Sequence, residues 1–293
     1  MALYTIQNEF LTVTVCDKGA ELHSVKTADG CEYLWQGQTP GLWKDRAPVL
    51  FPICGQVFGG IYTWEGKTYE LGGHHGFARR MTFRVTQTSA DCLRLTLTAN
   101  EESRRVYPFE FSLSLCYRLK ENRLFCTAEI ENMGTGVMPF SFGLHPGFNV
   151  PLDDTAFEDW QLTFSQVCAP RELVINEDGF LTGEFIPRPL VEGRILPLSH
   201  SLFDINSPFY KEMADTVRLE SSKSPRSVTL SYPGFLYLGL WHDEKTEAPY
   251  VCIEPWYGMA SLQGVTDDFA TKEDMITLKS GEKTALECVF TIE

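Results

Sequence analysis

A histidine and a carboxylate stand at the ends of two short apolar stretches of this sequence. His145 precedes Pro146, and the proline pushes the histidine backbone toward extended geometry. Glu254 ends the apolar run that begins at Tyr250, and proline and aromatic residues follow it. Burial at such a position raises the pKa of a carboxyl group toward that of a working base, unless a cation or hydrogen bonds counter it. Together the two side chains have the chemistry of an acid/base pair.

Each of these residues also has a structural interpretation, which the residue alone leaves open. Glu254 is equally explained as a carboxylate that caps a strand or pairs with an arginine. His145 is equally explained as a core histidine whose ring satisfies a backbone carbonyl. Further residues of matching chemistry are needed to decide between the two interpretations.

A glycine-rich segment supplies a second histidine and an arginine. His75 lies in a run of glycines, and Arg79 follows four residues later. Neighbouring side chains on a strand point to opposite faces, so we expect at most one of His74 and His75 to face a common site. The guanidinium of Arg79 offers a fixed fork of donors for sugar hydroxyls or an anion. Arg46 has the same interpretation, and for both arginines the alternative is a solvated surface position.

Aromatic residues end two of the expected strands. Trp241 closes the strand that begins at Leu236, and Trp256 and Tyr257 close the next one. Such rings can stack on the apolar face of a sugar, although filling the core is the commoner role of tryptophan. The remaining histidines are scattered singly, whereas zinc sites need three or four ligands at characteristic spacings. The sequence therefore predicts no metal site.

The composition excludes several classes of partner. A net charge of −14 over 293 residues disfavours nucleic acid, because phosphate binding needs clustered lysine and arginine. We expect no membrane-spanning helix, because no apolar run approaches about 18 residues. The first residues lack the basic start and apolar core of a secretory signal. Nine cysteines, an odd number without a Cys-x-x-Cys pair, fit a reduced, cytoplasmic protein.

Alternation of apolar and polar residues is the dominant pattern. It runs through Leu93–Thr98, Phe109–Leu115 and Val228–Tyr232, and more than a dozen strands are expected in total. Helical periodicity is nearly absent, and its best candidate is Pro208–Ala214. The segment Arg171–Ser207 predicts a long surface loop. The pattern predicts an all-β fold, a large antiparallel β-sandwich, in one domain over residues 1–293.

Five segments, taken in order, resemble those of the galactose mutarotase-like superfamily, specifically bacterial aldose 1-epimerases of the LacX-like type. The resemblance covers almost the whole chain. Each segment is a weak signal alone, and their number and order make coincidence improbable. The segments are Tyr33–Gly37, Arg46–Pro52, His75–Arg79, His145–Asn149 and Ile253–Gly258.

The resemblance implies a β-sandwich with a concave sugar-binding face and no cofactor. It also implies that Glu254 is the catalytic base, that His145 is the acid, and that His75 and Arg79 hold the substrate. The family usually places a sugar-binding aspartate near residues 202–209, where Asp204 and Asn206 are the two candidates.

Together these observations predict an aldose 1-epimerase that interconverts the anomers of a small-molecule sugar, an aldohexose. In this hypothesis Glu254 starts ionised and His145 starts protonated. Two alternatives remain open at this point. One is a mutarotase for a phosphorylated or sulfonated hexose, for which Lys44, Arg46, Arg79 and Arg80 are candidate anion ligands. The other is a carbohydrate-binding protein without catalysis. The sequence carries no signature of an oligomer interface.

Overall fold

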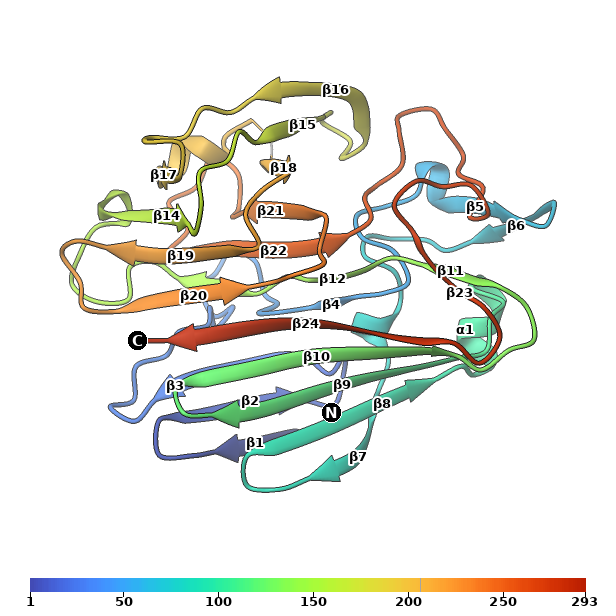
Figure 1. Cartoon of the computed structure of the whole chain (residues 1–293), viewed down its shortest axis with the longest axis horizontal. Coiled ribbons are helices and arrows are strands. Elements are labelled where there is room, and N and C mark those ends of the chain that lie inside the picture. Colours follow the sequence, from blue (N-terminus) through green and yellow to red (C-terminus); the bar gives the residue numbers. More distant parts are fainter. Residues whose placement is uncertain (206) are drawn as a thin grey trace.

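The computed structural model describes residues 1–205 and 207–293, so Asn206 lies outside the described residues. The fold is dominated by two large antiparallel sheets (Figure 1). The all-β sandwich predicted from the sequence is confirmed. The first sheet has nine strands, in the spatial order β17 (Ile195–Pro197), β14 (Trp160–Phe164), β19 (Thr216–Ser221), β20 (Ser227–Ser231), β24 (Lys283–Ile292), β10 (Arg123–Asn132), β9 (Phe111–Lys120), β8 (Cys92–Thr98) and β7 (Arg84–Thr88).

The second sheet has eight strands, and most of them are short. Its spatial order is β16 (Leu181–Pro187), β15 (Arg171–Ile175), β18 (Phe209–Lys211), β21 (Tyr237–Trp241), β22 (Tyr250–Tyr257), β12 (Phe142–Leu144) and β4 (Val49–Leu50), and β13 (Gly147–Asn149) also pairs with β22. In Figure 1 the β15–β16 hairpin forms the upper edge, and β7 and β8 lie at the opposite edge.

Smaller elements complete the fold. They are the three-stranded sheet β1 (Leu3–Gln7), β2 (Leu11–Cys16) and β3 (Leu22–Thr27), the hairpin β5 (Ile61–Trp64) and β6 (Lys67–Glu70), the pair β11 (Met138–Phe140) and β23 (Ile276–Leu278), the helix α1 (Glu101–Val106), and the 3₁₀ turns η1 (Phe58–Gly60), η2 (Ala78–Arg80), η3 (Phe157–Asp159) and η4 (His200–Phe203).

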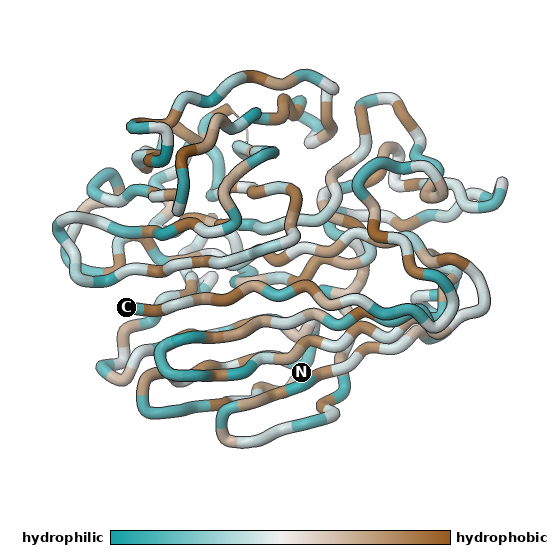
Figure 2. The backbone as a smooth tube through the Cα atoms, in the orientation of Figure 1, coloured by the Kyte–Doolittle hydropathy of each residue, from teal (hydrophilic) through white to brown (hydrophobic). Residues whose placement is uncertain are grey.

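The main core lies between the two large sheets. Leu113 and Leu115 of β9 belong to the same buried apolar cluster as Val251 and Ile253 of β22. Because side chains alternate along a strand, the other face of β22 carries Glu254 and its neighbours of the same parity. Figure 2 shows this alternation as changing hydropathy along the long strands. The chemistry-bearing face of β22 is therefore the one turned away from the main core.

Several local predictions can be compared with the structure. The hairpin of β5 and β6 turns at Gly66, which has a φ of 73°. The predicted helix Pro208–Ala214 is wrong, because Phe209–Lys211 is strand β18, paired with β15 and β21. Pairing with two neighbouring strands overrides a weak local preference for helix. The predicted loop Arg171–Ser207 is also wrong, because it contains β15, β16, β17 and η4.

Two further observations concern the environment of the chain. No helix among residues 1–205 and 207–293 is long and apolar enough to cross a membrane. All nine cysteines are described, and each is a free thiol. Five of them are buried, where a free thiol packs as a small apolar side chain.

Candidate active site

The register of the second sheet brings His145 and Glu254 together. Gly143 of β12 pairs with Trp256 of β22, and Gly147 of β13 pairs with Cys252. The same antiparallel register places His145, midway between the two glycines, opposite Glu254. Directly opposite residues of an antiparallel pair share one face of the sheet. Two residues 109 positions apart in the sequence thus become neighbours through strand pairing.

The backbone around His145 departs from a regular strand. Pro146 lacks an N–H group and cannot donate to β22, so the strand is interrupted between β12 and β13. The backbone N–H of His145 instead donates to the carbonyl of Pro48 (3.1 Å), and the carbonyl of Pro146 accepts from Ile253 (3.1 Å). These bonds fix the histidine at the interruption without a continuous ladder.

His145 and Glu254 form a close, buried pair. The Nε2 atom of His145 lies 3.2 Å from Oε2 of Glu254, and the two side chains are 10% and 1% exposed. Neither carboxylate oxygen of Glu254 has a hydrogen-bond partner among the described residues, and neither does Nδ1 of His145. Buried polar groups normally have partners, so unpartnered groups at a cavity mark a place where a ligand supplies them.

Burial sets the proton positions in this pair. It lowers the pKa of His145 to about 3 and raises the pKa of Glu254 well above its ordinary value. The neutral forms of both groups are therefore favoured, with the proton on the carboxyl group. The sequence-based expectation of an ionised Glu254 beside a protonated His145 therefore differs from the proton position that burial favours in the free protein.

A strained turn presents His75 to the same cavity. His75 has a φ of 67°, and the following Gly76 approaches Phe51 so closely that a Cβ atom would lie 2.3 Å from the Phe51 carbonyl oxygen. The backbone N–H of Gly55 donates to Nδ1 of His75 (3.1 Å). This bond leaves the ring proton on Nε2. Burial lowers the pKa of His75 well below its ordinary value, so His75 is a neutral hydrogen-bond donor.

These side chains share one cavity of about 360 Å³, near the lower end of the usual size for small-molecule sites, about 300–1,000 Å³. His145, Glu254, His75, Arg79 and Trp241 all line it, so the structure brings together five of the predicted site residues. His74 lines it as well. The expectation that only one of the two histidines faces the site is wrong, because they lie in a turn and not on a strand.

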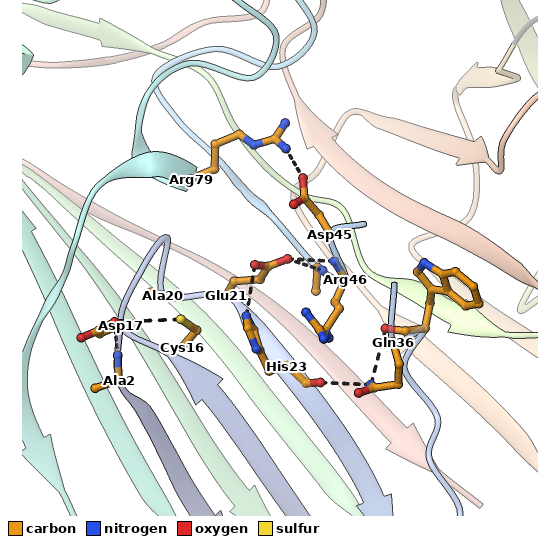
Figure 3. Close-up of polar contacts among 12 residues, drawn as sticks. Ala2, Cys16, Asp17, Ala20, Glu21, His23, Gln36, Asp45, Arg46 and Arg79 are labelled. Atoms are coloured by element: carbon orange, nitrogen blue, oxygen red, sulfur yellow. Dashed lines mark hydrogen bonds and ion pairs between the residues drawn. The ribbon is translucent and has the colours of Figure 1, made fainter. Parts of the chain in front are cut away.

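Arg79 reaches the cavity from η2 and is held by an acidic partner. Its Nη2 donates to Asp45, as Figure 3 shows. Arg46 does not line this cavity and lies in a neighbouring pocket with Arg79 and Glu21. Glu21 accepts the backbone N–H of Arg46 (2.9 Å). In Figure 3, Arg46 and Glu21 lie on the side of Asp45 that is away from Arg79. Arg79 is thus the arginine that the cavity shares with its neighbour.

Of the two candidates for the sugar-binding aspartate position, the structure describes only one. Asp204 follows η4, is half-buried and does not line the cavity. Asn206 lies outside the described residues. Ser207, one residue later, does line the cavity. The segment therefore borders the site through Ser207.

Several residues that line the cavity are not predicted from the sequence. Trp43 comes from a loop, Asn176 and Glu177 come from the connection between β15 and β16, and Glu244 follows β21. None of them stands in a pattern that alternates or in a glycine-rich turn. For Trp43, the sequence offers one indication, its position shortly after Trp35 of the segment Tyr33–Gly37.

Comparison with known proteins shows the family of this chain. The family model described as aldose 1-epimerase matches residues 2–291. Protein LacX, chromosomal, from Lactococcus lactis subsp. lactis is 31% identical over 266 residues, which cover 87% of this chain and 88% of that protein.

Two solved structures are similar along their whole length. A galactose mutarotase related enzyme from Lactobacillus acidophilus is 34% identical with a TM-score of 0.93, covering 100% of this chain and 97% of the other. A galactose mutarotase-like protein from Lactobacillus casei ATCC 334 is 32% identical with a TM-score of 0.94, covering 100% of both chains. The fold, the site and these similarities lead to one conclusion: the chain belongs to the aldose 1-epimerase family.

Proposed function

We propose that this protein is an aldose 1-epimerase that interconverts the α and β anomers of a neutral aldohexose. The observation that carries the proposal is the buried pair of Glu254 and His145, 3.2 Å apart, with unpartnered carboxylate oxygens at a cavity of sugar size. An acid and a base on neighbouring strands can reach the two oxygens of one anomeric centre.

In the proposed reaction, sugar binding first moves the proton of the pair. The sugar hydroxyls donate to the carboxylate oxygens of Glu254, which lack partners in the free protein, and such hydrogen bonds favour the ionised carboxylate. The proton then resides on His145. His75 donates from Nε2 toward the substrate and stays neutral throughout.

Ring opening and closure then use the two groups in opposite directions. Glu254 removes the proton of the anomeric hydroxyl, the C1–O1 bond becomes a carbonyl, and the C1–O5 bond breaks. His145 gives its proton to O5. After rotation about the C1–C2 bond, His145 takes the proton back, O5 attacks the other carbonyl face, and Glu254 returns a proton to O1. The pair ends with the proton it began with, so no cofactor is needed.

The charges around the cavity favour a neutral sugar over a phosphorylated or sulfonated one. Among the described lining residues the acidic side chains are Glu177, Glu244 and Glu254, of which Glu254 is neutral in the free protein, and the single guanidinium, Arg79, is bound to Asp45. Lys44, Arg46 and Arg80, considered earlier as anion ligands, do not line the cavity. An anionic substrate would therefore meet net repulsion.

Polarimetry on freshly dissolved α-glucose and α-galactose tests the proposal. We expect the wild-type protein to accelerate mutarotation and His145→Ala to abolish the acceleration. Faster mutarotation of a hexose 6-phosphate than of the free hexoses would show that the substrate is phosphorylated and not neutral. Saturable sugar binding without acceleration of any of these sugars would instead establish a carbohydrate-binding protein.

A further inference from the structure

Trp43 forms a wall of the cavity although no regular element carries it. It lies in the segment between β3 and β4, and its ring centroid is 5.0 Å from that of His145 and 5.4 Å from that of Trp241. The ring lines the cavity directly. An indole in this place excludes water from His145 and offers an apolar face to a sugar. Because loops are more mobile than strands, the position of the Trp43 ring depends on contacts between its loop and the rest of the protein.

The carboxylate of Asp243 is the contact that holds the Trp43 backbone from one side. Its Oδ2 accepts the backbone N–H of Trp43 (2.8 Å) and the hydroxyl of Tyr250 (2.7 Å). The residues are 200 positions apart in the sequence, and Asp243 lies in the connection between β21 and β22. Hydrogen bonds to a charged acceptor are stronger than those between neutral groups.

Two other contacts hold the same loop from the opposite side. The indole Nε1 of Trp35 donates to the carbonyl of Trp43 (2.8 Å). A Cβ atom on Gly37 would lie 2.3 Å from the carbonyl oxygen of Lys44, so the two ends of the loop approach as only glycine permits. Among the described residues, Asp243 is the charged group whose side chain ties the Trp43 loop to the connection between β21 and β22.

We infer that Asp243 is a positioning residue for catalysis, acting through Trp43. It fixes the indole as a wall that keeps water from His145 and as a stacking face for the sugar. The inference rests on the proposed mutarotase function for its kinetic consequences. Its structural consequence, the shielding of His145, can be measured without any turnover.

The side chain of Asp243 can be substituted without removing the hydrogen bonds that its backbone carbonyl makes in the turn after β21. The turn uses the backbone carbonyl of Asp243, which accepts from Thr246 Oγ1 (2.7 Å) and lies 2.7 Å from Nδ1 of His242. Substitution of the side chain leaves these bonds available. Asp243→Ala therefore tests the clamp on Trp43, and Asp243→Asn retains an acceptor of the same shape without the charge. Glu247→Gln, an exposed position of the same connection, is the matched control.

The decisive experiment is a comparison of Asp243→Ala, Trp43→Ala and the double variant. We expect each single variant to lower kcat/KM by about tenfold, mainly through KM. The double variant should be no worse than Trp43→Ala, because residues that act through one another are not additive. Asp243→Asn should recover part of the loss, and Glu247→Gln should match the wild type. Independent, additive losses would overturn the inference.

A titration of His145 by NMR provides the readout that needs no activity. Among the described residues, the titratable and charged groups facing His145 are Glu254, Cys252, His75, Arg79 and Glu21, and all of them stay in the Asp243→Ala variant. We expect the His145 pKa to rise in Asp243→Ala and in Trp43→Ala, because water then reaches the ring. An unchanged titration in a folded Asp243→Ala protein would overturn the inference. If Asp243→Ala does not fold, Asp243→Asn takes its place, with the same direction expected. An inactive wild type would refute the proposed function and leave this titration as the test of the clamp.

Discussion

The two large sheets of this protein differ in regularity, and the difference separates stability from chemistry. The nine-stranded sheet contains three strands of ten residues, β9, β10 and β24, paired in continuous register. The eight-stranded sheet contains strands of two to eight residues, and it is interrupted at His145 and Pro146. The regular sheet carries none of the lining residues of the cavity in the described part of the chain, whereas the interrupted sheet carries Glu254 and Trp241.

Two glycines of the second sheet allow aromatic side chains that line the site to pack closely on its backbone. Gly239 allows Phe209 to approach so closely that a Cβ atom would lie 2.3 Å from its ring, and Phe209 packs on Trp256 with ring centroids 4.4 Å apart. Gly143 allows a similar approach of Trp256.

The comparison predicts its largest effect at Glu254. Glu254→Gln keeps the shape of the side chain but removes the proton acceptor, so we expect the mutarotation rate constant to fall by about 10²- to 10⁴-fold. Sugar affinity, measured by calorimetry, should change little, since the amide still accepts and donates hydrogen bonds. Full turnover in this variant would show that the chemistry lies elsewhere in the molecule.

The regular sheet should show the opposite behaviour. Leu113 of β9 is fully buried in the main core, so Leu113→Ala should lower the free energy of unfolding by about 2–5 kcal/mol. The kcat and KM of the folded fraction should stay unchanged, because the strand partners of Leu113 are Ile130 and Leu97, and neither lines the cavity. Denaturant unfolding and polarimetry on one preparation measure both. A loss of turnover without a loss of stability would contradict the division between the sheets.

The same contrast explains how far the sequence alone could lead. Alternation predicts the long strands well, because each of their faces has one constant environment, as in Phe111–Lys120. Glu254 and His145 were also found, because each ends an apolar stretch. Trp43 and Glu177 were not, since they reach the cavity from loops whose paths depend on contacts with distant residues such as Asp243. The strand β18 was missed because its three residues gain their conformation from β15 and β21.

A smaller effect is expected in the pH dependence of stability. The pKa of His145 falls from 6.5 to about 3 on folding, so between these values the unfolded chain binds a proton that the native protein does not. Stability therefore falls as the pH drops through this window. Relative to His145→Gln, the wild type should lose about 1.6 kcal/mol between pH 6.5 and 5, because the slope reaches about 1.4 kcal/mol per unit only below the unfolded pKa. Denaturant unfolding of both proteins at the two pH values measures this loss. An equal change in the free energy of unfolding for both proteins would contradict the burial of a neutral histidine.

The smallest effect should come from the polar face of the regular sheet. Arg94 of β8 and Glu129 of β10 form a two-pronged ion pair there, with Nη1 2.9 Å from Oε1, and the side chains are 25% and 44% exposed. The Arg94 guanidinium holds the pKa of Glu129 below its ordinary value, so the pair contributes stability at neutral pH that is lost as the pH falls. Solvent screens it, and Glu129→Gln should cost less than about 1 kcal/mol without altering turnover. A double-mutant cycle with Arg94→Gln measures the coupling. A change in kcat would show that the outer face of the regular sheet communicates with the cavity, which its uninterrupted packing argues against.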